Sequence, residues 1–303
     1  MGHNGDIASP ALKPPPFDYL APASLEEALD ALAEAGDDAK VLAGGQSLIP
    51  LMALRLAQPA VLVDVNGVSE LNTLDQGEGV LTIGAVVRHR TAERSAVVRD
   101  AAPLLAEAMP LIGHAAIRSR GTIGGSMAHA DPAAELPAVA SALDATFIAR
   151  SRDRGERTIT VDDFFQGYFT TSLAPDEILC SVSFPVLPPS AGVAVEEIAR
   201  RHGDFAMVGA AAAVVVGGDT ITDARVVLIN VAERPIRARE AEAAIRGTGA
   251  SNRSGVFAEA AVLATRDLEP SDDLHASGAY RRKVAAVCVR RALTTATTRA
   301  MGA

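Results

Sequence analysis

Two short glycine segments constrain the fold of this chain of 303 residues more than any other feature. They are Gly44-Gly45-Gln46-Ser47 and Gly124-Gly125-Ser126. Glycine allows a positive backbone φ and lets a ligand approach the main-chain amides closely. Successive exposed N–H groups form an anion-binding concavity, to which the serine hydroxyls add donors. Each segment alone is also compatible with a simple tight turn. Together, converging on one pyrophosphate, they could bind its charge without a lysine.

The residues around the first segment predict a small βαβ unit. Ser24 is placed to cap a helix over residues 25–35, and Gly36 to end it. A short strand then enters the first glycine segment, which lies at the positive N-terminal end of the next helix. The expected elements are strand 40–42, helix 48–56 and strand 60–65.

The second glycine segment falls in a longer block that ends at a proline-rich boundary. The elements expected in this block are strand 79–87, helix 91–109, helix 131–143, a hairpin of 145–150 with 157–161, and strand 177–184. Residues 185–192, P-V-L-P-P-S-A-G, have the composition of a linker. Beyond it we expect strands 193–199, 206–216 and 221–231, then helices 237–246, 256–265 and 274–299.

These elements predict an α+β protein of two domains. We expect an extended arm over residues 1–16 and a first domain over 17–188, with subdomains of about 17–70 and 71–188. A second domain over 193–300 is expected to hold a three-stranded antiparallel sheet and helices.

Charge, cysteine count and missing motifs exclude several classes of function. The chain has 28 Lys and Arg against 37 Asp and Glu, a formal net charge of −9, which disfavours nucleic acid and anionic membranes as partners. Its two cysteines cannot hold an iron–sulfur cluster, which normally needs four. The sequence lacks a P-loop, G-x-G-x-x-G, H-E-x-x-H and G-x-S-x-G. The longest uncharged apolar run, residues 205–218, is too short to span a bilayer, and without a visible targeting segment we expect a cytoplasmic protein.

Several motifs give the chain a specific resemblance. They are V-L-A-G-G-Q-S-L-I-P-L-M at 41–52, L-V-D-V-N at 62–66, I-R-S-R-G-T-I-G-G-S-M-A-H-A-D-P-A-A-E-L-P at 117–137 and R-R-H-G-D-F-A at 200–206. Through these motifs nearly the whole chain resembles the FAD-binding medium subunit of molybdenum hydroxylases, the family of xanthine dehydrogenase and carbon monoxide dehydrogenase.

The resemblance implies a domain of the vanillyl-alcohol-oxidase (PCMH) type, in which two α/β subdomains clasp non-covalent FAD. It implies that residues 41–48 and 122–126 hold the pyrophosphate. Ile112 and Gly113 would contact the flavin or its linker, Glu135 would accept from cofactor hydroxyls, and Leu179 would lie near the adenine or the ring. The residues carried over as cofactor-binding are Val41, Leu42, Ala43, Gly44, Gly45, Gln46, Ser47, Leu48, Ile112, Gly113, Ile117, Thr122, Ile123, Gly124, Gly125, Ser126, Glu135 and Leu179.

The resemblance also implies partners. A large subunit would hold the molybdenum cofactor, and a small subunit would hold two [2Fe–2S] clusters, in a dimer of heterotrimers. The flavin would then relay electrons from the clusters to an external acceptor, with no catalytic acid or base on this chain. Some xanthine dehydrogenases carry lysine where Glu196 stands, so the resemblance does not imply an NAD-type acceptor.

Two other functions are compatible with the residues alone. One is a self-sufficient small flavoprotein oxidoreductase of the same fold, and the other is a non-enzymatic interaction module. The sequence leaves open the substrate and the acceptor. It also leaves open whether His114 and His129 contact the flavin, and whether Arg118 and Arg120 face the pyrophosphate or solvent.

Overall fold

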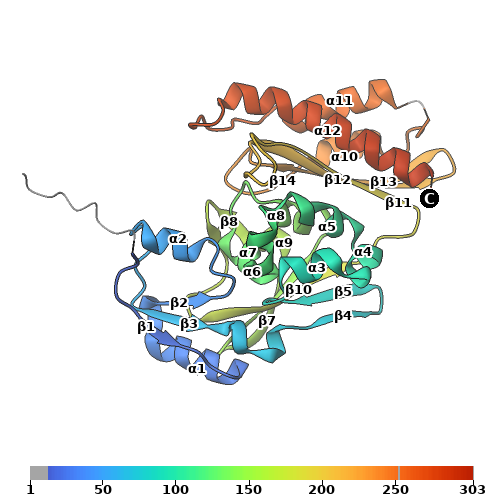
Figure 1. The fold of residues 1–303 in the computed structure, drawn as a ribbon. Helices are drawn as coiled ribbons and strands as arrows, with labels where there is room; N and C mark the ends of the chain where they lie inside the picture. The colour runs from blue at the N-terminus through green and yellow to red at the C-terminus, as the bar shows by residue number, and fades with distance from the viewer. Residues whose placement is uncertain (1–12, 252, 303) are drawn as a thin grey trace, which may run out of the picture.

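The computed structural model describes residues 13–251 and 253–302. Residues 1–12 of the expected arm therefore lie outside the described residues. The described residues form three larger β-sheets, one built from the N-terminal residues, one from the middle of the chain and one from the C-terminal third (Figure 1), together with a two-stranded sheet of residues 165–167 and 170–171. Helices from the middle of the chain lie between the second and third sheets, and the C-terminal helices cover the far side of the third.

The N-terminal sheet has three parallel strands and confirms the predicted βαβ unit. Its spatial order is β1 (Asp18–Leu20), β3 (Val61–Asp64) and β2 (Ala39–Leu42). Helix α1 (Leu25–Ala35) precedes β2, and helix α2 (Leu48–Ala53) connects β2 to β3. The N–H of Glu27 donates to Ser24 Oγ at 3.2 Å, which satisfies one free amide of the first turn of α1.

The middle of the chain forms a five-stranded antiparallel sheet. Its order is β4 (Leu74–Gly77), β5 (Val80–Gly84), β10 (Glu177–Pro185), β6 (Thr146–Ser151) and β7 (Gly155–Thr160). The β6–β7 hairpin is as predicted. The helices that follow β5 are α3 (His89–Arg94), α4 (Ala96–Ala101), α5 (Pro103–Ala108), α6 (Ala115–Arg120), α7 (Ile123–His129) and α8 (Glu135–Ala142). Between β7 and β10 lie helix α9 (Val161–Phe164) and the short strands β8 (Phe165–Gly167) and β9 (Thr170–Thr171).

The predicted helix over residues 91–109 is wrong, because the chain forms three short helices there. Ser95 Oγ accepts the N–H of Val98 at 3.3 Å and so starts a new helix. Pro103 occupies the first turn of the third helix, where its missing N–H is not needed. The expected helix 48–56 ends at Ala53, and the expected helix 131–143 begins only at Glu135.

The C-terminal sheet has four antiparallel strands, not the three predicted. They are β11 (Ala191–Ile198), β12 (Val208–Gly217), β13 (Thr220–Ile229) and the two-residue strand β14 (Ile236–Arg237). Three helices follow, α10 (Arg239–Ile245), α11 (Ser254–Thr265) and α12 (Gly278–Met301). Within the described ranges, no helix is both long and apolar enough to cross a bilayer.

Both faces of the C-terminal sheet are buried, and side-chain alternation decides which core each residue joins. The odd-numbered residues Val193, Ala211 and Val227 pack into the core that contains the middle helices and the five-stranded sheet. The even-numbered residues Ala194, Ala210 and Val226 pack into a separate core with α11 and α12. Gly192 has no room for a side chain, because a Cβ there would overlap the carbonyl oxygen of Ala296 in α12.

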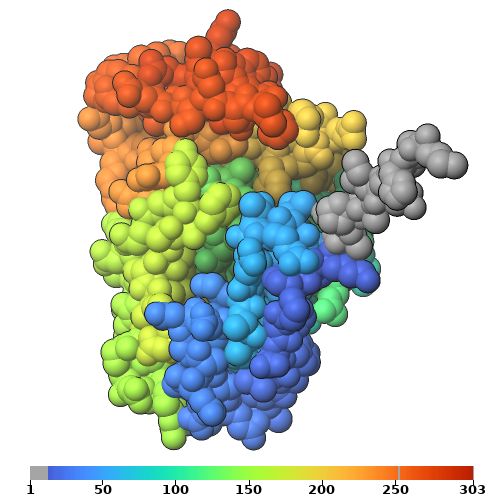
Figure 2. Space-filling model, turned by 90° about the vertical axis from the view of Figure 1, so that its left-hand side faces the viewer, coloured from blue at the N-terminus to red at the C-terminus, as the bar shows by residue number. Residues whose placement is uncertain are grey.

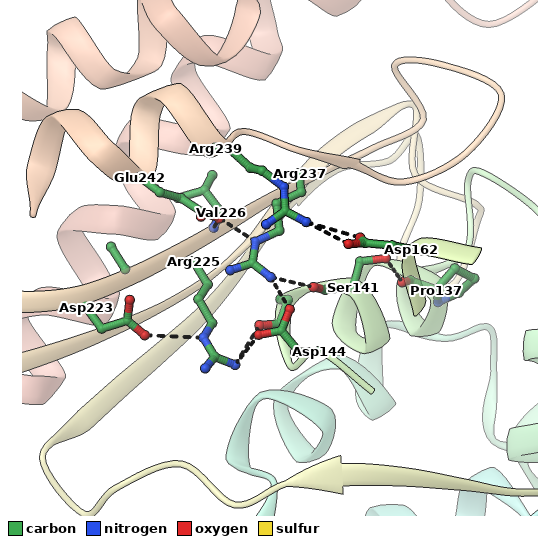
Figure 3. Close-up of polar contacts among 12 residues, drawn as sticks. Pro137, Ser141, Asp144, Asp162, Asp223, Arg225, Val226, Arg237, Arg239 and Glu242 are labelled. Carbon is green, nitrogen blue, oxygen red and sulfur yellow. Dashed lines mark hydrogen bonds and ion pairs between the residues drawn. The ribbon is translucent and has the colours of Figure 1, made fainter. Parts of the chain in front are cut away.

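Ion pairs join the C-terminal sheet to the end of α8 (Figure 3). Asp144 follows α8 and pairs with Arg225 at 3.1 Å and with Arg237. Arg237 also donates to the buried Glu242 at 2.7 Å. Nearby, Arg239 pairs with Asp162 at 2.9 Å. These contacts fix the C-terminal sheet against the middle helices.

Candidate functional site

The first glycine segment presents a row of free main-chain donors. Gly45 has φ +71°, the left-handed region that glycine adopts without strain. None of the N–H groups of residues 44–48 donates to another described residue. The carbonyls of Gly45 and Ser47 instead accept from Ile49 and Leu51 of α2. These five amides, at the N-terminus of α2, form the kind of concavity that binds an anion.

The second glycine segment is different, because it is the first turn of α7 and not a loop. The N–H groups of Ile123 and Gly124 donate to the carbonyls of Val87 and Ala85, at 3.0 and 2.9 Å. Those of Gly125 and Ser126 donate to Thr122, the N-cap residue, at 3.0 and 3.1 Å. The amides that we expected to be free are therefore occupied in this segment. A Cβ at Gly124 would overlap Ala85, so this glycine allows α7 to approach the end of β5.

The structure brings the two segments into contact. A Cβ at Gly44 would lie 2.6 Å from the Arg120 carbonyl oxygen and 2.8 Å from the Gly121 Cα. A Cβ at Gly125 would lie 3.6 Å from the Ala43 Cβ. A cavity of about 330 Å³ opens beside this contact; it is lined by residues 42–46, Ile49, Pro50 and Arg120. Figure 2 views the face where the N-terminal part, in blue, borders the green and yellow-green middle of the chain.

Two residues that sequence analysis did not assign to the site hold these segments together. Asn66 Nδ2 donates to the Ala43 carbonyl at 2.7 Å. Arg88 donates to Asn66 Oδ1 at 2.6 Å and to the Arg120 carbonyl at 2.5 Å. Burial and the neighbouring Arg120 charge lower the pKa of Arg88. Asn66 ends the L-V-D-V-N motif at 62–66, but only the fold shows that the side chains of Asn66 and Arg88 reach the two backbones.

Two buried side chains, His89 and Arg118, hydrogen-bond main-chain carbonyls next to the second glycine segment and at residues 112–113. His89 is buried, and its burial lowers the pKa to about 4, so the ring is neutral at pH 7 and its Nε2–H donates to the Thr122 carbonyl at 2.9 Å. Arg118 is also buried and donates to the carbonyls of Ile112 and Gly113 at 3.0 and 2.8 Å. Arg118 therefore orders residues 112–113 and does not face solvent, whereas Arg120 lines the cavity.

The other predicted residues lie at different depths, and those named next do not line this cavity. Gly113 has φ +50°, and Ile117 is 39% exposed beside it. Leu179 is buried in the core of the five-stranded sheet. Glu135 is buried at the start of α8. His129 contacts the ring of Phe169 with centroids 5.1 Å apart.

Comparison with known proteins then decides the family. The family model described as the FAD binding domain in molybdopterin dehydrogenase matches residues 15–187. The chain belongs to this family. A second model, described as the CO dehydrogenase flavoprotein C-terminal domain, matches residues 193–296.

Two relatives match this chain over nearly their full length. The caffeine dehydrogenase subunit beta of Pseudomonas sp. (strain CBB1) is 40% identical over 288 residues, covering 95% of this chain and 97% of the relative. The carbon monoxide dehydrogenase medium chain of Hydrogenophaga pseudoflava is 36% identical, covering 93% and 98%.

Solved structures give the same answer. The carbon monoxide dehydrogenase from H. pseudoflava superposes with a TM-score of 0.91 at 38% identity, covering 94% of this chain and 99% of that chain. The quinoline 2-oxidoreductase from Pseudomonas putida 86 superposes with a TM-score of 0.91 at 39% identity, covering 95% and 99%. The resemblance predicted from the motifs is confirmed, and the chain is an FAD-binding component of an oxidoreductase.

Proposed function

We propose that this flavoprotein is the electron-transfer subunit of a molybdenum hydroxylase. Its FAD takes electrons from [2Fe–2S] clusters on a partner chain and passes them to an external acceptor. The observation that supports this proposal most directly is the row of free amides at residues 44–48, set against the backbone of Arg120 and Gly121. Main-chain donors at a helix N-terminus suit a diphosphate, which FAD contains.

The residues present fit that cofactor. In our proposal the amides of residues 44–48 and the hydroxyls of Ser47 and Ser126 bind the pyrophosphate, with Arg120 adding positive charge. The backbones of residues 41–43 and 122–123 hold this cradle in shape, and Ile112, Gly113 and Ile117 contact the flavin end. Bound FAD supplies one- and two-electron redox chemistry. The chain's own residues bind the cofactor, orient it and keep it against the second glycine segment.

The clusters and the molybdenum centre are assigned to other chains. A [2Fe–2S] cluster normally needs four ligands, and this chain has two cysteines. Burial raises the pKa of both Cys180 and Cys288 to about 11, so both thiols stay protonated at neutral pH. The relatives named medium chain and medium subunit support a larger and a smaller partner, in a complex that we take to be a dimer of heterotrimers.

The two matched family models support two domains within the chain. We propose that residues 17–188 form the FAD-binding domain and residues 193–300 a second domain that closes one side of it. The matched models, at 15–187 and 193–296, support this division.

Purification from the native cells tests the proposal. We expect a yellow complex that releases FAD on acid treatment and contains a larger molybdenum chain and a smaller iron–sulfur chain. Adding the substrate of the complex should bleach the visible absorbance of the flavin only when all three chains are present. A colourless chain, or a flavin in the isolated chain that substrate reduces without partners, would refute the proposal.

A further inference from the structure

Arg88 connects the two glycine segments, and its backbone is bound to the second of them. The N–H of His89 donates to the Gly121 carbonyl at 2.9 Å. Arg88 itself pairs with Thr122 as an antiparallel bridge. Thr122 is the N-cap residue of α7, whose first turn is the second glycine segment. The Arg88 side chain therefore starts from a fixed position beside that segment.

The guanidinium group of Arg88 bonds to both sides of the cradle. One Nη atom donates to the carbonyl of Arg120, the last residue of α6, at 2.5 Å. The other Nη atom donates to Asn66 Oδ1 at 2.6 Å. Asn66 follows β3 in the N-terminal sheet, whereas Arg120 belongs to the middle of the chain. Because a guanidinium presents its donors in a rigid planar fork, it holds these two acceptors at a fixed separation.

The side chain of Asn66 connects Arg88 to the first glycine segment. Its Nδ2 atom donates to the Ala43 carbonyl at 2.7 Å and to Asp64 Oδ1 at 2.5 Å. Asp64 is held in turn by the Tyr19 hydroxyl, which donates to its Oδ2 at 2.5 Å. Both amide hydrogens and the amide oxygen of Asn66 are therefore used. The amide cannot rotate without losing hydrogen bonds, so the Ala43 carbonyl keeps a fixed position relative to Arg88.

The two sides joined by Arg88 offer different groups to an anion. The first side offers the free amides of residues 44–48. The second side offers the side chain of Arg120, which lines the same cavity of about 330 Å³ as residues 42–46. One phosphate group can accept from the amides, and a second phosphate linked to it can pair with Arg120. Arg88 does not line this cavity, so it acts on a ligand through the placement of these groups.

We propose that Arg88 is a positioning residue that sets the spacing between the amides of residues 44–48 and the Arg120 side chain, and that this spacing selects ligands with two linked phosphate groups over ligands with one. A monophosphate needs only one side of the cradle and gains nothing from the fixed spacing. A diphosphate spans both sides, so its affinity depends on the bridge made by Arg88. This inference rests on the proposed function, because it takes the diphosphate of FAD as the ligand.

Competition between FAD and adenine nucleotides tests this inference. The full-length chain is stripped of cofactor, FAD binding is followed by quenching of flavin fluorescence, and ADP or AMP is added as competitor. We expect the wild type to bind ADP at least about tenfold more tightly than AMP. Arg88→Met keeps an unbranched side chain but removes both hydrogen bonds. It should raise the dissociation constants of FAD and ADP by roughly tenfold or more, and that of AMP by less than about threefold.

Two further variants separate spacing from charge and from local damage. Arg88→Lys keeps the positive charge but lacks the rigid fork, so it should show the same selective loss of ADP affinity as Arg88→Met. Asn66→Ala combined with Arg88→Met should raise the ADP dissociation constant by less than the product of the two single effects, because the two side chains are in contact. Arg94→Met is the matched control, since it removes an exposed arginine from the neighbouring helix α3. It should bind all three ligands as the wild type does.

The ratio of the ADP and AMP affinities distinguishes the possible results. An equal loss of affinity for AMP and ADP in Arg88→Met would show that Arg88 only stabilises the fold. Wild-type affinities in Arg88→Lys would show that its charge is sufficient. Either result, or a wild type that binds AMP as tightly as ADP, would overturn this inference but leave the proposed function intact. Failure of the wild-type chain to bind FAD would overturn both.

Discussion

Replacement of Gly44 by alanine tests whether contact between the two glycine segments is needed for FAD binding. The new Cβ would lie 2.6 Å from the Arg120 carbonyl oxygen and 2.8 Å from the Gly121 Cα. Both atoms belong to the backbone, so no side chain can rotate away, and the segments must separate. Overpacking of this kind typically costs about 1–3 kcal/mol.

Most of that cost should fall on binding. Without cofactor the segments can relax apart, but FAD bound by the proposed cradle requires them to stay together. A loss of about 1–3 kcal/mol corresponds to a dissociation constant raised by roughly 5- to 150-fold. Isothermal titration of the cofactor-free chain with FAD measures this change, and urea unfolding of the same preparation measures the remaining loss of stability.

Gly77→Ala is the control for this experiment. Gly77 has no atom within 4 Å of its ideal Cβ and does not have a positive φ. The Gly77→Ala variant should bind FAD with the wild-type dissociation constant. Gly45→Ala should be intermediate, because the Cβ would meet only the side chains of Ile49 and Leu42, at 3.2 and 3.3 Å, although φ is +71°. If Gly44→Ala binds FAD with the wild-type dissociation constant, the contact between segments is not part of the site.

Three further predictions concern the residues around the cradle. Asn66→Ala removes the hydrogen bond to Ala43 and should lower the free energy of unfolding by about 1–2 kcal/mol. A change below about 0.5 kcal/mol in urea titrations would show that Asn66 does not hold the two segments together. Asp144→Ala removes the acceptor of two arginines and should lower the free energy of unfolding by about 1 kcal/mol. Asp162→Ala removes a highly exposed ion pair and should lower it by less, and urea titrations of both variants make the comparison. Burial raises the pKa of Glu135 to about 8 and that of Glu197 to about 7. The cofactor-free chain should lose thermal stability from about pH 5 to pH 8, because carboxyl groups whose folded pKa is raised favour the folded state only while protonated. Calorimetry of Glu135→Gln should show a shallower loss of thermal stability with pH. A loss identical to that of the wild type would show that Glu135 is not one of the groups whose pKa is raised.

The parts of the fold that follow from local signals could be predicted from the sequence. The βαβ unit has a capping serine, an apolar helix face and a glycine turn within a few residues of each other. The break of the 91–109 region also has local signals, since Ser95 is a good N-cap and Pro103 suits a first helical turn, but the apolar periodicity continues across both. Strand β14 has two residues, too few to show any alternation.

The site could be predicted only where its contacts are close in sequence. The free amides at residues 44–48 come from one turn and were expected. In the second segment the amides of Gly125 and Ser126 bond to the nearby N-cap residue Thr122. The amide of Gly124 bonds to Ala85, nearly forty residues earlier, and nothing near the glycines shows that it is occupied. The roles of Asn66 and Arg88 are hidden for the same reason, because each reaches a carbonyl more than twenty residues away.

The C-terminal sheet separates two independently packed hydrophobic cores. The small residues of β12, Gly209 to Ala213, set how closely both neighbours can approach it, so a bulkier residue on either side would displace only one of them. Grafting the part of a relative that corresponds to β11 through α12 onto this chain would therefore bring in the face that packs on α11 and α12 intact and leave the other face to pack against this chain's own α5 and α8. Such hybrids should fold when the odd-numbered positions of β11, β12 and β13 are exchanged together with α5 and α8.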